Sequence, residues 1–286
     1  MKRLLPTVCV ALALCGCGKT LSDRLAALEM RPAEVSPTRL VLTSPRCRIV
    51  LHRGSAVATV NGVPVQLPSP ATCEKGRCWD LPEDAIRRVL MPLLDPSPHP
   101  VRVILVDPGH GGHDRGSAAA SGTVEKELNL ALAKELASAL RAVGFVVRMT
   151  RENDVFIPLD RRASAAPADL FISVHHNSAA NTAASGMETF VLRAETPSEQ
   201  TGVAAALRLA FLIQKERGRV PGLPDRGVRF ARFKVLRLAT PTPAVLIEAG
   251  FLSNPVEAAR CADREHRRLL AAAIARAVVS WRDGGR

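Results

Sequence analysis

The stretch Val103-Ile-Leu-Val-Asp-Pro-Gly-His-Gly-Gly112 decides how this chain folds. Four apolar, mostly β-branched residues predict a buried strand. Asp107-Pro108-Gly109 ends it, because proline lacks a backbone donor and glycine accepts a positive φ. His110 therefore follows the carboxyl end of a strand, the edge at which open α/β sheets place their sites. A histidine in a glycine-rich loop can equally be a solvated turn residue, so this stretch alone predicts no function.

Strands and helices alternate from residue 101 onward, which predicts an α/β fold with a mixed, largely parallel sheet flanked by helices. Leucines at a four-residue spacing predict an amphipathic helix over about 125–143. A last helix is expected over about 264–281. Further strands are expected at 145–150, 169–177, 186–192, 235–238 and 244–248.

Residues 39–95 predict a separate small module of a β-hairpin and a helix. Asn61-Gly62 favours a type I′ turn, because that turn needs a positive φ at both central positions. The segment 82–94 has helical spacing with acidic residues in its first turn. The proline-rich segment 95–100 is the expected boundary to a larger domain at 101–286.

The first 17 residues resemble a bacterial signal peptide, with a basic start and an apolar run too short to span a bilayer. Leu14-Cys-Gly-Cys17 resembles a lipoprotein signal box, in which Cys17 would be the lipidated first residue of the mature chain. An ordinary cleaved signal is the alternative. Residues 18–38 are expected to form a tether. The sequence therefore predicts an exported protein of the cell envelope or periplasm, anchored to a membrane through lipid.

Export favours disulfide bonds, and Cys73 and Cys78 flank a short polar turn that would suit one. Cys47 and Cys261 could pair or stay free. The formal net charge of +12 suits either an anionic partner or an arginine-rich surface. A nucleic-acid partner is not expected, because the sequence has no zinc-finger spacing, no RNA-recognition aromatic pattern and no Tyr.

Four ionisable residues lie at expected strand ends or helix starts, namely His110, Glu125, His175 and Glu248. Each alone has an ordinary explanation; a glutamate that opens a helix, for example, interacts favourably with the helix dipole. Two histidines and one glutamate together match a catalytic zinc site with an open fourth position. A further glutamate could then act as general base. The His-Glu-x-x-His motif is absent from the sequence, so such ligands would come from separated loops.

Several motifs follow one another between residues 101 and 282 in the order typical of one family. They are Asp107-Pro-Gly-His-Gly-Gly112, Gly122-Thr-Val-Glu-Lys126, Ala168-Asp-Leu-Phe-Ile-Ser-Val-His-x-Asn177, Gly186-x-Glu-Thr-Phe190, Asp225-Arg-Gly-Val-Arg-Phe230 and Pro243-Ala-Val-Leu-Ile-Glu-Ala-Gly-Phe-Leu-Ser-Asn-Pro255. This part of the chain resembles the zinc-dependent N-acetylmuramoyl-L-alanine amidases, the family called amidase type 3.

The resemblance implies Zn²⁺ ligands at His110, Glu125 and His175, and a catalytic glutamate at Glu248. His176 competes with His175, but strand alternation puts the two on opposite faces, and the family's Ser-x-His-x-Asn pattern selects His175. The implied substrate is peptidoglycan. The bond cleaved would join the lactyl group of N-acetylmuramic acid to L-alanine of the stem peptide.

Asn177, Arg226 and Arg229 are expected to bind the substrate, the arginines through stem-peptide carboxylates, with plain surface charge as the alternative. Glu188 could line the cleft or face solvent. Some relatives place a zinc-blocking helix after the strand of His175, but only Ser178–Ser185 lies there in this sequence. No activator is therefore expected to be needed. Two other functions stay open: a zinc peptidase that cuts within stem peptides, and a catalytically silent wall-binding lipoprotein.

Overall fold

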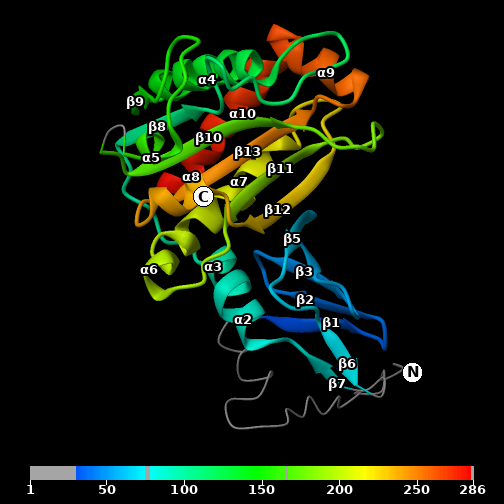
Figure 1. The fold of residues 1–286 in the computed structure, drawn as a ribbon. Helices are drawn as coiled ribbons and strands as arrows, with labels where there is room; N and C mark the ends of the chain where they lie inside the picture. Colours follow the sequence, from blue (N-terminus) through cyan, green and yellow to red (C-terminus); the bar gives the residue numbers. More distant parts are fainter. Residues whose placement is uncertain (1–29, 75–77, 165–166, 285–286) are drawn as a thin grey trace, which may run out of the picture. The chain divides into compact units, whose positions relative to one another are not determined.

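The protein is described by a computed structural model at residues 30–74, 78–164 and 167–284, drawn in colour in Figure 1. The chain divides into two compact units, Met1–Leu94 and Asp95–Arg286. The predicted signal peptide and the lipidation residue Cys17 lie outside the described residues.

The first unit is built on a meander in which consecutive strands pair antiparallel. Its strands are β1 (Arg31–Val35), β2 (Arg39–Thr43), β3 (Arg48–His52), β4 (Val57–Val60) and β5 (Val63–Gln66). The turn between β4 and β5 has φ of 48° at Asn61 and 88° at Gly62, which confirms the predicted hairpin. Strand β1 lies within the segment predicted as a tether, so that prediction is wrong for these residues.

The rest of the first unit is a short hairpin and a helical segment. Strands β6 (Thr72–Glu74) and β7 (Cys78–Asp80) pair with each other. The helical turns α2 (Glu83–Ala85), η1 (Ile86–Leu90) and α3 (Met91–Leu94) follow without a break, as the spacing in 82–94 predicts. Trp79 of β7 is buried, and its indole Nε1 donates to the Ser36 carbonyl at 2.9 Å.

Cys73 is a buried free cysteine in the structure, which contradicts the predicted Cys73–Cys78 disulfide. In the β6–β7 ladder Cys73 pairs with Trp79, whereas Cys78 pairs with Glu74. The two cysteines are therefore not opposite one another. The side chain of Cys78 lies outside the described part of the chain.

The second unit contains a mixed sheet whose strands lie in the order β9-β8-β10-β13-β11-β12. They span β8 (Val103–Pro108), β9 (Val146–Met149), β10 (Leu170–Asn177), β11 (Met187–Leu192), β12 (Asp225–Ala231) and β13 (Ala244–Phe251). Strands β9, β8, β10 and β13 are parallel, whereas β11 runs antiparallel to β13 and parallel to β12. The predicted mixed, largely parallel sheet is confirmed. The carboxyl ends of β8, β10 and β13 therefore meet at one edge.

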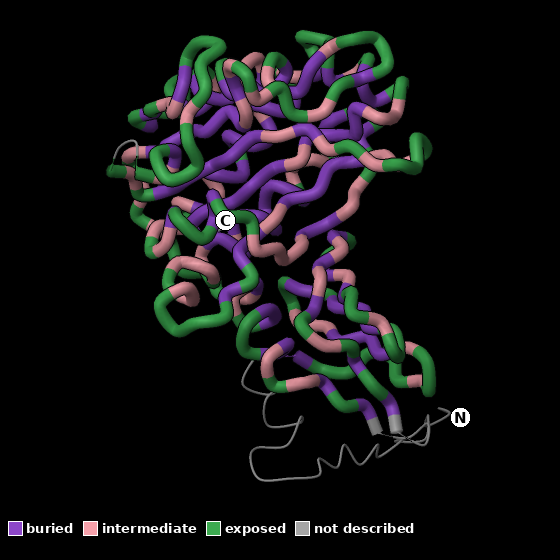
Figure 2. The backbone as a smooth tube through the Cα atoms, viewed as in Figure 1, coloured by how far each residue is buried: buried purple, intermediate pink, exposed green. Residues whose placement is uncertain are grey.

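Helices cover the sheet of the second unit, and its central strands are buried along most of their length (Figures 1 and 2). The long helices are α4 (Glu125–Ala142), α7 (Val203–Arg217) and α10 (Arg264–Arg282), and α10 contacts both of the others. The shorter ones are α5 (Leu159–Arg162), α6 (Pro197–Gln200), α8 (Lys234–Ala239) and α9 (Pro255–Ala262). The predicted leucine stripe of α4 is buried at Leu128, Leu132, Leu136 and Leu140. It packs toward β8, β9, β10 and α10.

The strand predicted at 235–238 is wrong, because these residues belong to helix α8. Val235, Leu236 and Ala239 are buried at helical spacing and pack against Leu105, Phe171 and Leu246 of the sheet. A short apolar run does not reveal its period, so the sequence favoured the wrong element. The strand β12 just before it, which carries Arg226 and Arg229, was not predicted.

The connection between β10 and β11 contains no helix. Its residues, 178–186, form bends and a turn. None of the helices within the described ranges is both long and apolar enough to cross a bilayer.

We predict that Leu136→Ala lowers the free energy of unfolding by about 2–5 kcal/mol, because this side chain of α4 is fully buried and its loss leaves a cavity. Urea unfolding of the full chain measures the change. Leu269→Ala in α10 is the control, since its side chain is 40% exposed and should change stability little. Equal effects of the two substitutions would contradict the described core.

Candidate metal centre

His110 lies just after β8 in a left-handed conformation, with φ of 60°. Few residues other than glycine adopt this conformation, so the surrounding structure must hold it. Two buried arginines do so. Arg162 donates from Nη1 to the Pro108 carbonyl at 2.9 Å and from Nη2 to the His110 carbonyl at 2.8 Å. Arg151 donates from Nη2 to the Gly109 carbonyl at 2.9 Å.

The Arg162 guanidinium is itself held by Asp107. Asp107, which is fully buried, accepts from Arg162 Nη1 at 2.9 Å and from the hydroxyls of Thr150 and Ser173 at 2.6 and 2.8 Å. Gly109 then passes close to the His175 imidazole, where a Cβ would overlap the ring. Only glycine fits there, so the Asp-Pro-Gly-His stretch brings the two histidines together.

Glu125 opens helix α4 and is buried, at 5% exposure. Its Oε2 accepts from the backbone N–H and the hydroxyl of Ser117 at 2.9 and 3.0 Å. Its Oε1 is thereby directed toward the histidines, and Asn129 Nδ2 also donates to it at 3.2 Å. Burial alone would raise the pKa of Glu125, but hydrogen bonds and charge from His110 and His175 lower that pKa far below its ordinary value.

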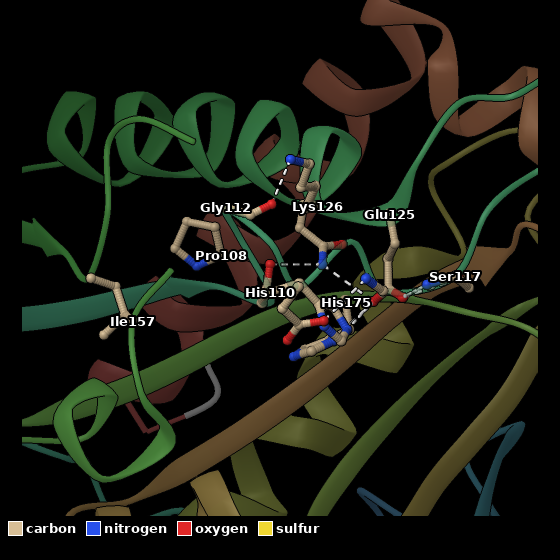
Figure 3. A network of polar contacts seen from close by, with 12 residues as sticks. Pro108, His110, Gly112, Ser117, Glu125, Lys126, Ile157 and His175 are labelled. Atoms are coloured by element: carbon tan, nitrogen blue, oxygen red, sulfur yellow. Dashed lines mark hydrogen bonds and ion pairs between the residues drawn. The ribbon is translucent and has the colours of Figure 1, made fainter. Parts of the chain in front are cut away.

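His110, Glu125 and His175 converge, as Figure 3 shows. The Glu125 Oε1 atom lies 3.2 Å from His110 Nε2 and 3.0 Å from His175 Nδ1. One ligand atom from each residue lies within 4.8 Å of the other two. Two imidazole nitrogens and one carboxylate oxygen suit a transition metal such as zinc. The donor set therefore fits a metal ion.

Asp114 orients the first of these ligands. Its Oδ1 lies 2.9 Å from Nδ1 of His110, on the side of the ring away from Glu125. Burial would lower the pKa of His110, but hydrogen bonds and charge from Glu125 and Asp114 raise it above its ordinary value. Histidines that bind a metal commonly donate from their other ring nitrogen to a carboxylate, which fixes the tautomer and the orientation of the ring.

Glu248 lies beside this group but outside it. It pairs with His175 in the β10–β13 ladder and with Glu188 in the β11–β13 ladder. Its Oε2 is buried and has no hydrogen-bond partner among the described residues. Burial, and then the charges of Glu125 and Glu188, raise the pKa of Glu248 well above its ordinary value. A carboxylate in this state readily accepts a proton, which is what a general base requires.

His176 points away from the metal ligands and is buried, at 2% exposure. Its Nδ1 lies 2.8 Å from Oδ1 of Asn129, and its backbone N–H donates to Glu125 Oε1 at 3.3 Å. Burial lowers the pKa of His176 to about 4, so the ring is neutral at pH 7. His176 supports the ligand Glu125 from the opposite face of β10.

The three predicted substrate-binding residues gather around one carboxylate, that of Glu188. Asn177 Nδ2 donates to its Oε1 at 2.8 Å. The Nε atoms of Arg226 and Arg229 lie 3.3 and 2.6 Å from its Oε2. Glu188 is 4% exposed, so it lines the site from within rather than facing solvent.

Sequence reasoning missed the residues that hold the ligands, namely Asp114, Ser117, Asn129, Arg151 and Arg162. A buried arginine carries no sequence signal in a chain with 39 Lys and Arg residues. Asn129 could have been found, because it lies four residues after Glu125 and so on the same face of α4.

Sheet and site together define an α/β protein that carries a candidate metal centre and a separate half-buried glutamate at the carboxyl edge of its parallel strands. Residues 104–280 match the family described as N-acetylmuramoyl-L-alanine amidase, also called Amidase_3. The chain belongs to this family.

Named relatives and solved structures agree with the assignment. The chain is 36% identical over 181 residues to the N-acetylmuramoyl-L-alanine amidase LytC of Bacillus subtilis, a match that covers 62% of this chain and 35% of LytC. It is 35% identical over 218 residues to AmiC of Neisseria meningitidis, covering 63% of this chain and 52% of AmiC. The chain thus spans about a third to a half of these relatives.

Among solved structures, the amidase AmiC2 of Nostoc punctiforme superposes with a TM-score of 0.56 at 31% identity, covering 63% of this chain and 96% of AmiC2. The CwlD amidase of Clostridioides difficile, solved in complex with the GerS lipoprotein, gives a TM-score of 0.54 at 27% identity. That match covers 63% of this chain and 98% of CwlD.

We predict that His176 makes the protein less stable as the pH falls from about 6.5 to about 4. In this window the unfolded histidine binds a proton, whereas the folded one stays neutral. A difference between 6.5 and about 4 corresponds to about 3 kcal/mol. Urea unfolding of the His176→Gln variant should show a loss smaller by about this amount between pH 7 and pH 4. The exposed His113→Gln should keep the parent pH dependence; an unchanged slope in both variants would contradict the assignment.

We also predict that Arg162→Met lowers the affinity for a divalent metal about 10- to 100-fold, because the His110 loop loses its support. Competition with a chromophoric chelator, with Zn²⁺ and Co²⁺ as probes, measures the affinity. The neighbouring Arg161 is exposed, so Arg161→Met is a matched control with the same change of charge. Equal affinities in the two variants would show that the arginine does not position the ligand.

Proposed function

We propose that this chain is a zinc-dependent hydrolase of the cell wall that cleaves the amide between the lactyl group of N-acetylmuramic acid and L-alanine of the stem peptide. One observation carries the proposal. A His-Glu-His ligand set lies beside a separate half-buried glutamate, Glu248, on the next strand of the sheet. The printed names of the relatives, N-acetylmuramoyl-L-alanine amidases, support the same reaction.

His110, Glu125 and His175 would hold the zinc ion, which supplies a Lewis acid and lowers the pKa of water when it is bound. The protein's own contribution is orientation and proton transfer. Asp114 and Ser117 fix His110 and Glu125, so the ligands are aligned before the substrate arrives.

Glu248 would move the proton. Its unpartnered Oε2 would accept a proton from the attacking water as the amide carbon is attacked. The same carboxyl group would then give that proton to the nitrogen of L-alanine as the C–N bond breaks. The raised pKa of Glu248 favours both transfers, because a carboxyl group that titrates nearer to neutral pH can accept and return a proton.

We further propose that the protein is exported and anchored through a lipid on Cys17. The basic and apolar start of the sequence and the Leu-Cys-Gly-Cys pattern support this proposal. We also propose that the protein needs no activator, since residues 178–186 hold no helix that could cover the ligands. Shortening this segment should therefore not raise the rate of peptidoglycan hydrolysis by a large factor.

We expect Glu248→Gln to lower the rate of stem-peptide release from purified peptidoglycan by about 100- to 10,000-fold, because the general base is lost. A chelator should abolish the release by the parent chain, and added Zn²⁺ should restore it. The assay counts new amino-terminal L-alanine on the released peptides. Metal content of each preparation is measured in parallel, so that loss of the base is separated from loss of the ion.

Glu265→Gln is the control for this assay, because its side chain is 59% exposed and lies in α10. Cleavage within the stem peptide would be consistent with the metal site, but it would identify the protein as a peptidase rather than an amidase. Binding to the wall without any release would favour the silent wall-binding protein.

A further inference from the structure

Glu188 holds two arginines with a single carboxylate. Its Oε2 lies 2.6 Å from Nε of Arg229 and 3.3 Å from Nε of Arg226. Its Oε1 accepts from Asn177, which is neutral. This group of side chains therefore carries one more positive than negative charge.

Glu216 of the second unit also holds two arginines, since its Oε2 lies 3.0 Å from Nε of Arg219 and 2.9 Å from Nε of Arg276. Arg217 is matched by one acid, Asp225, at 3.1 Å. Arg232 lies between two acids, Glu195 and Glu199, at 3.2 and 2.9 Å. Glu188 differs from Glu216 in burial, since its side chain is 5% exposed against 17%, and in its position opposite Glu248 in the sheet.

Both arginines keep a face toward solvent. The side chain of Arg229 is 42% exposed and that of Arg226 is 32% exposed. The ion pairs with Glu188 use Nε in each case, which leaves the Nη edge of Arg229 for a ligand. Arg226 is held more firmly, because its guanidinium stacks 4.7 Å from the Phe251 ring and its Nη1 donates to the Ser185 carbonyl at 3.4 Å.

The sheet fixes how far this charge lies from the reaction centre. His175 pairs with Glu248, and Glu248 pairs with Glu188. On the next strand, Phe190 pairs with Arg229. Neighbouring strands are about 4.8 Å apart, and both guanidinium groups contact the Glu188 carboxylate, so these groups lie roughly 5–10 Å from Glu248. An extended peptide advances about 3.3–3.6 Å per residue, and this distance corresponds to one or two residues beyond the scissile amide.

We propose that Glu188, Arg226 and Arg229 form a carboxylate subsite that selects stem peptides whose second residue carries a free α-carboxylate. This inference rests on the proposed function. The second residue of the stem is a glutamate joined through its side-chain carboxyl, so its α-carboxyl group is free or amidated. A guanidinium binds a carboxylate through charge-assisted, paired hydrogen bonds. A carboxamide has no charge and offers one acceptor oxygen where the carboxylate offers two.

Glu188 acts in this subsite as a positioning residue. It is buried and engages the arginines rather than the ligand. Its Oε2 lies within ion-pair distance of both Nε atoms, and Asn177 in turn fixes the carboxylate. The arginines would touch the substrate, and Glu188 would set where they do so.

The test compares two synthetic muramoyl-tripeptide amides that differ only at this α-carboxyl group, one free and one amidated. The amidated carboxyl terminus removes every other carboxylate of the peptide. We expect kcat/KM to be at least about tenfold higher for the free acid, the usual size of a charged hydrogen bond. Arg229→Gln should reduce this ratio to near one, whereas Arg229→Lys should keep part of it.

Binding gives a second readout that does not depend on turnover. In the Glu248→Gln background, calorimetry should give the free acid a Kd at least about tenfold lower than the amide, and Arg229→Gln should remove the difference. Arg268→Gln is the control for net charge; its exposed side chain lies in α10, and the preference should persist.

Equal kcat/KM and equal Kd for the two peptides in the parent chain would overturn the subsite while leaving the amidase intact. Failure to cleave either peptide, with zinc bound, would refute the proposed function instead. In that case a preserved tenfold difference in Kd that depends on Arg229 would still support the carboxylate subsite.

Discussion

The structure of the site depends on how two buried guanidinium groups hold the backbone that follows β8. Arg151 and Arg162 donate to the carbonyls of Pro108, Gly109 and His110, and Asp107 neutralises one of them. Without these bonds Asn129 Nδ2 would still donate to the Gly109 carbonyl, but the carbonyls of Pro108 and His110 would lose these side-chain donors, and the left-handed conformation of His110 would relax. The first metal ligand is therefore positioned by residues that never approach the metal.

The order of the strands in the sheet determines how the functional side chains are arranged. Strand β10 carries His175, β13 carries Glu248, β11 carries Glu188 and β12 carries Arg229. Because consecutive strands in this order are neighbours, ligand, base, Glu188 and cation lie on successive strands about 4.8 Å apart. The antiparallel direction of β11 matters here, since it brings the start of that strand to the edge at which β10 and β13 end.

Sequence reasoning found the parts of this layout that depend on backbone period and on strand ends. The buried strand at 103–106, the leucine stripe of α4 and the hairpin at Asn61-Gly62 all follow local rules, and the structure confirms them. It failed where long-range packing decides. The apolar run of helix α8 is too short to show whether its period is that of a helix or of a strand. Strand pairing places Cys73 opposite Trp79, and the spacing of the cysteines in the sequence does not reveal this register. Buried Arg151 and Arg162 could not be told from the many surface arginines.

The placement of the two tryptophans has a spectroscopic consequence. Trp79 is buried in the first unit and Trp281 in the second, where its Nε1 donates to the Ala205 carbonyl at 2.9 Å. The sequence has no tyrosine, so these two indoles account for the near-ultraviolet emission of the protein. Each unit thus contains its own intrinsic fluorophore. Replacing one tryptophan with phenylalanine leaves an optical signal that reports on the other unit alone.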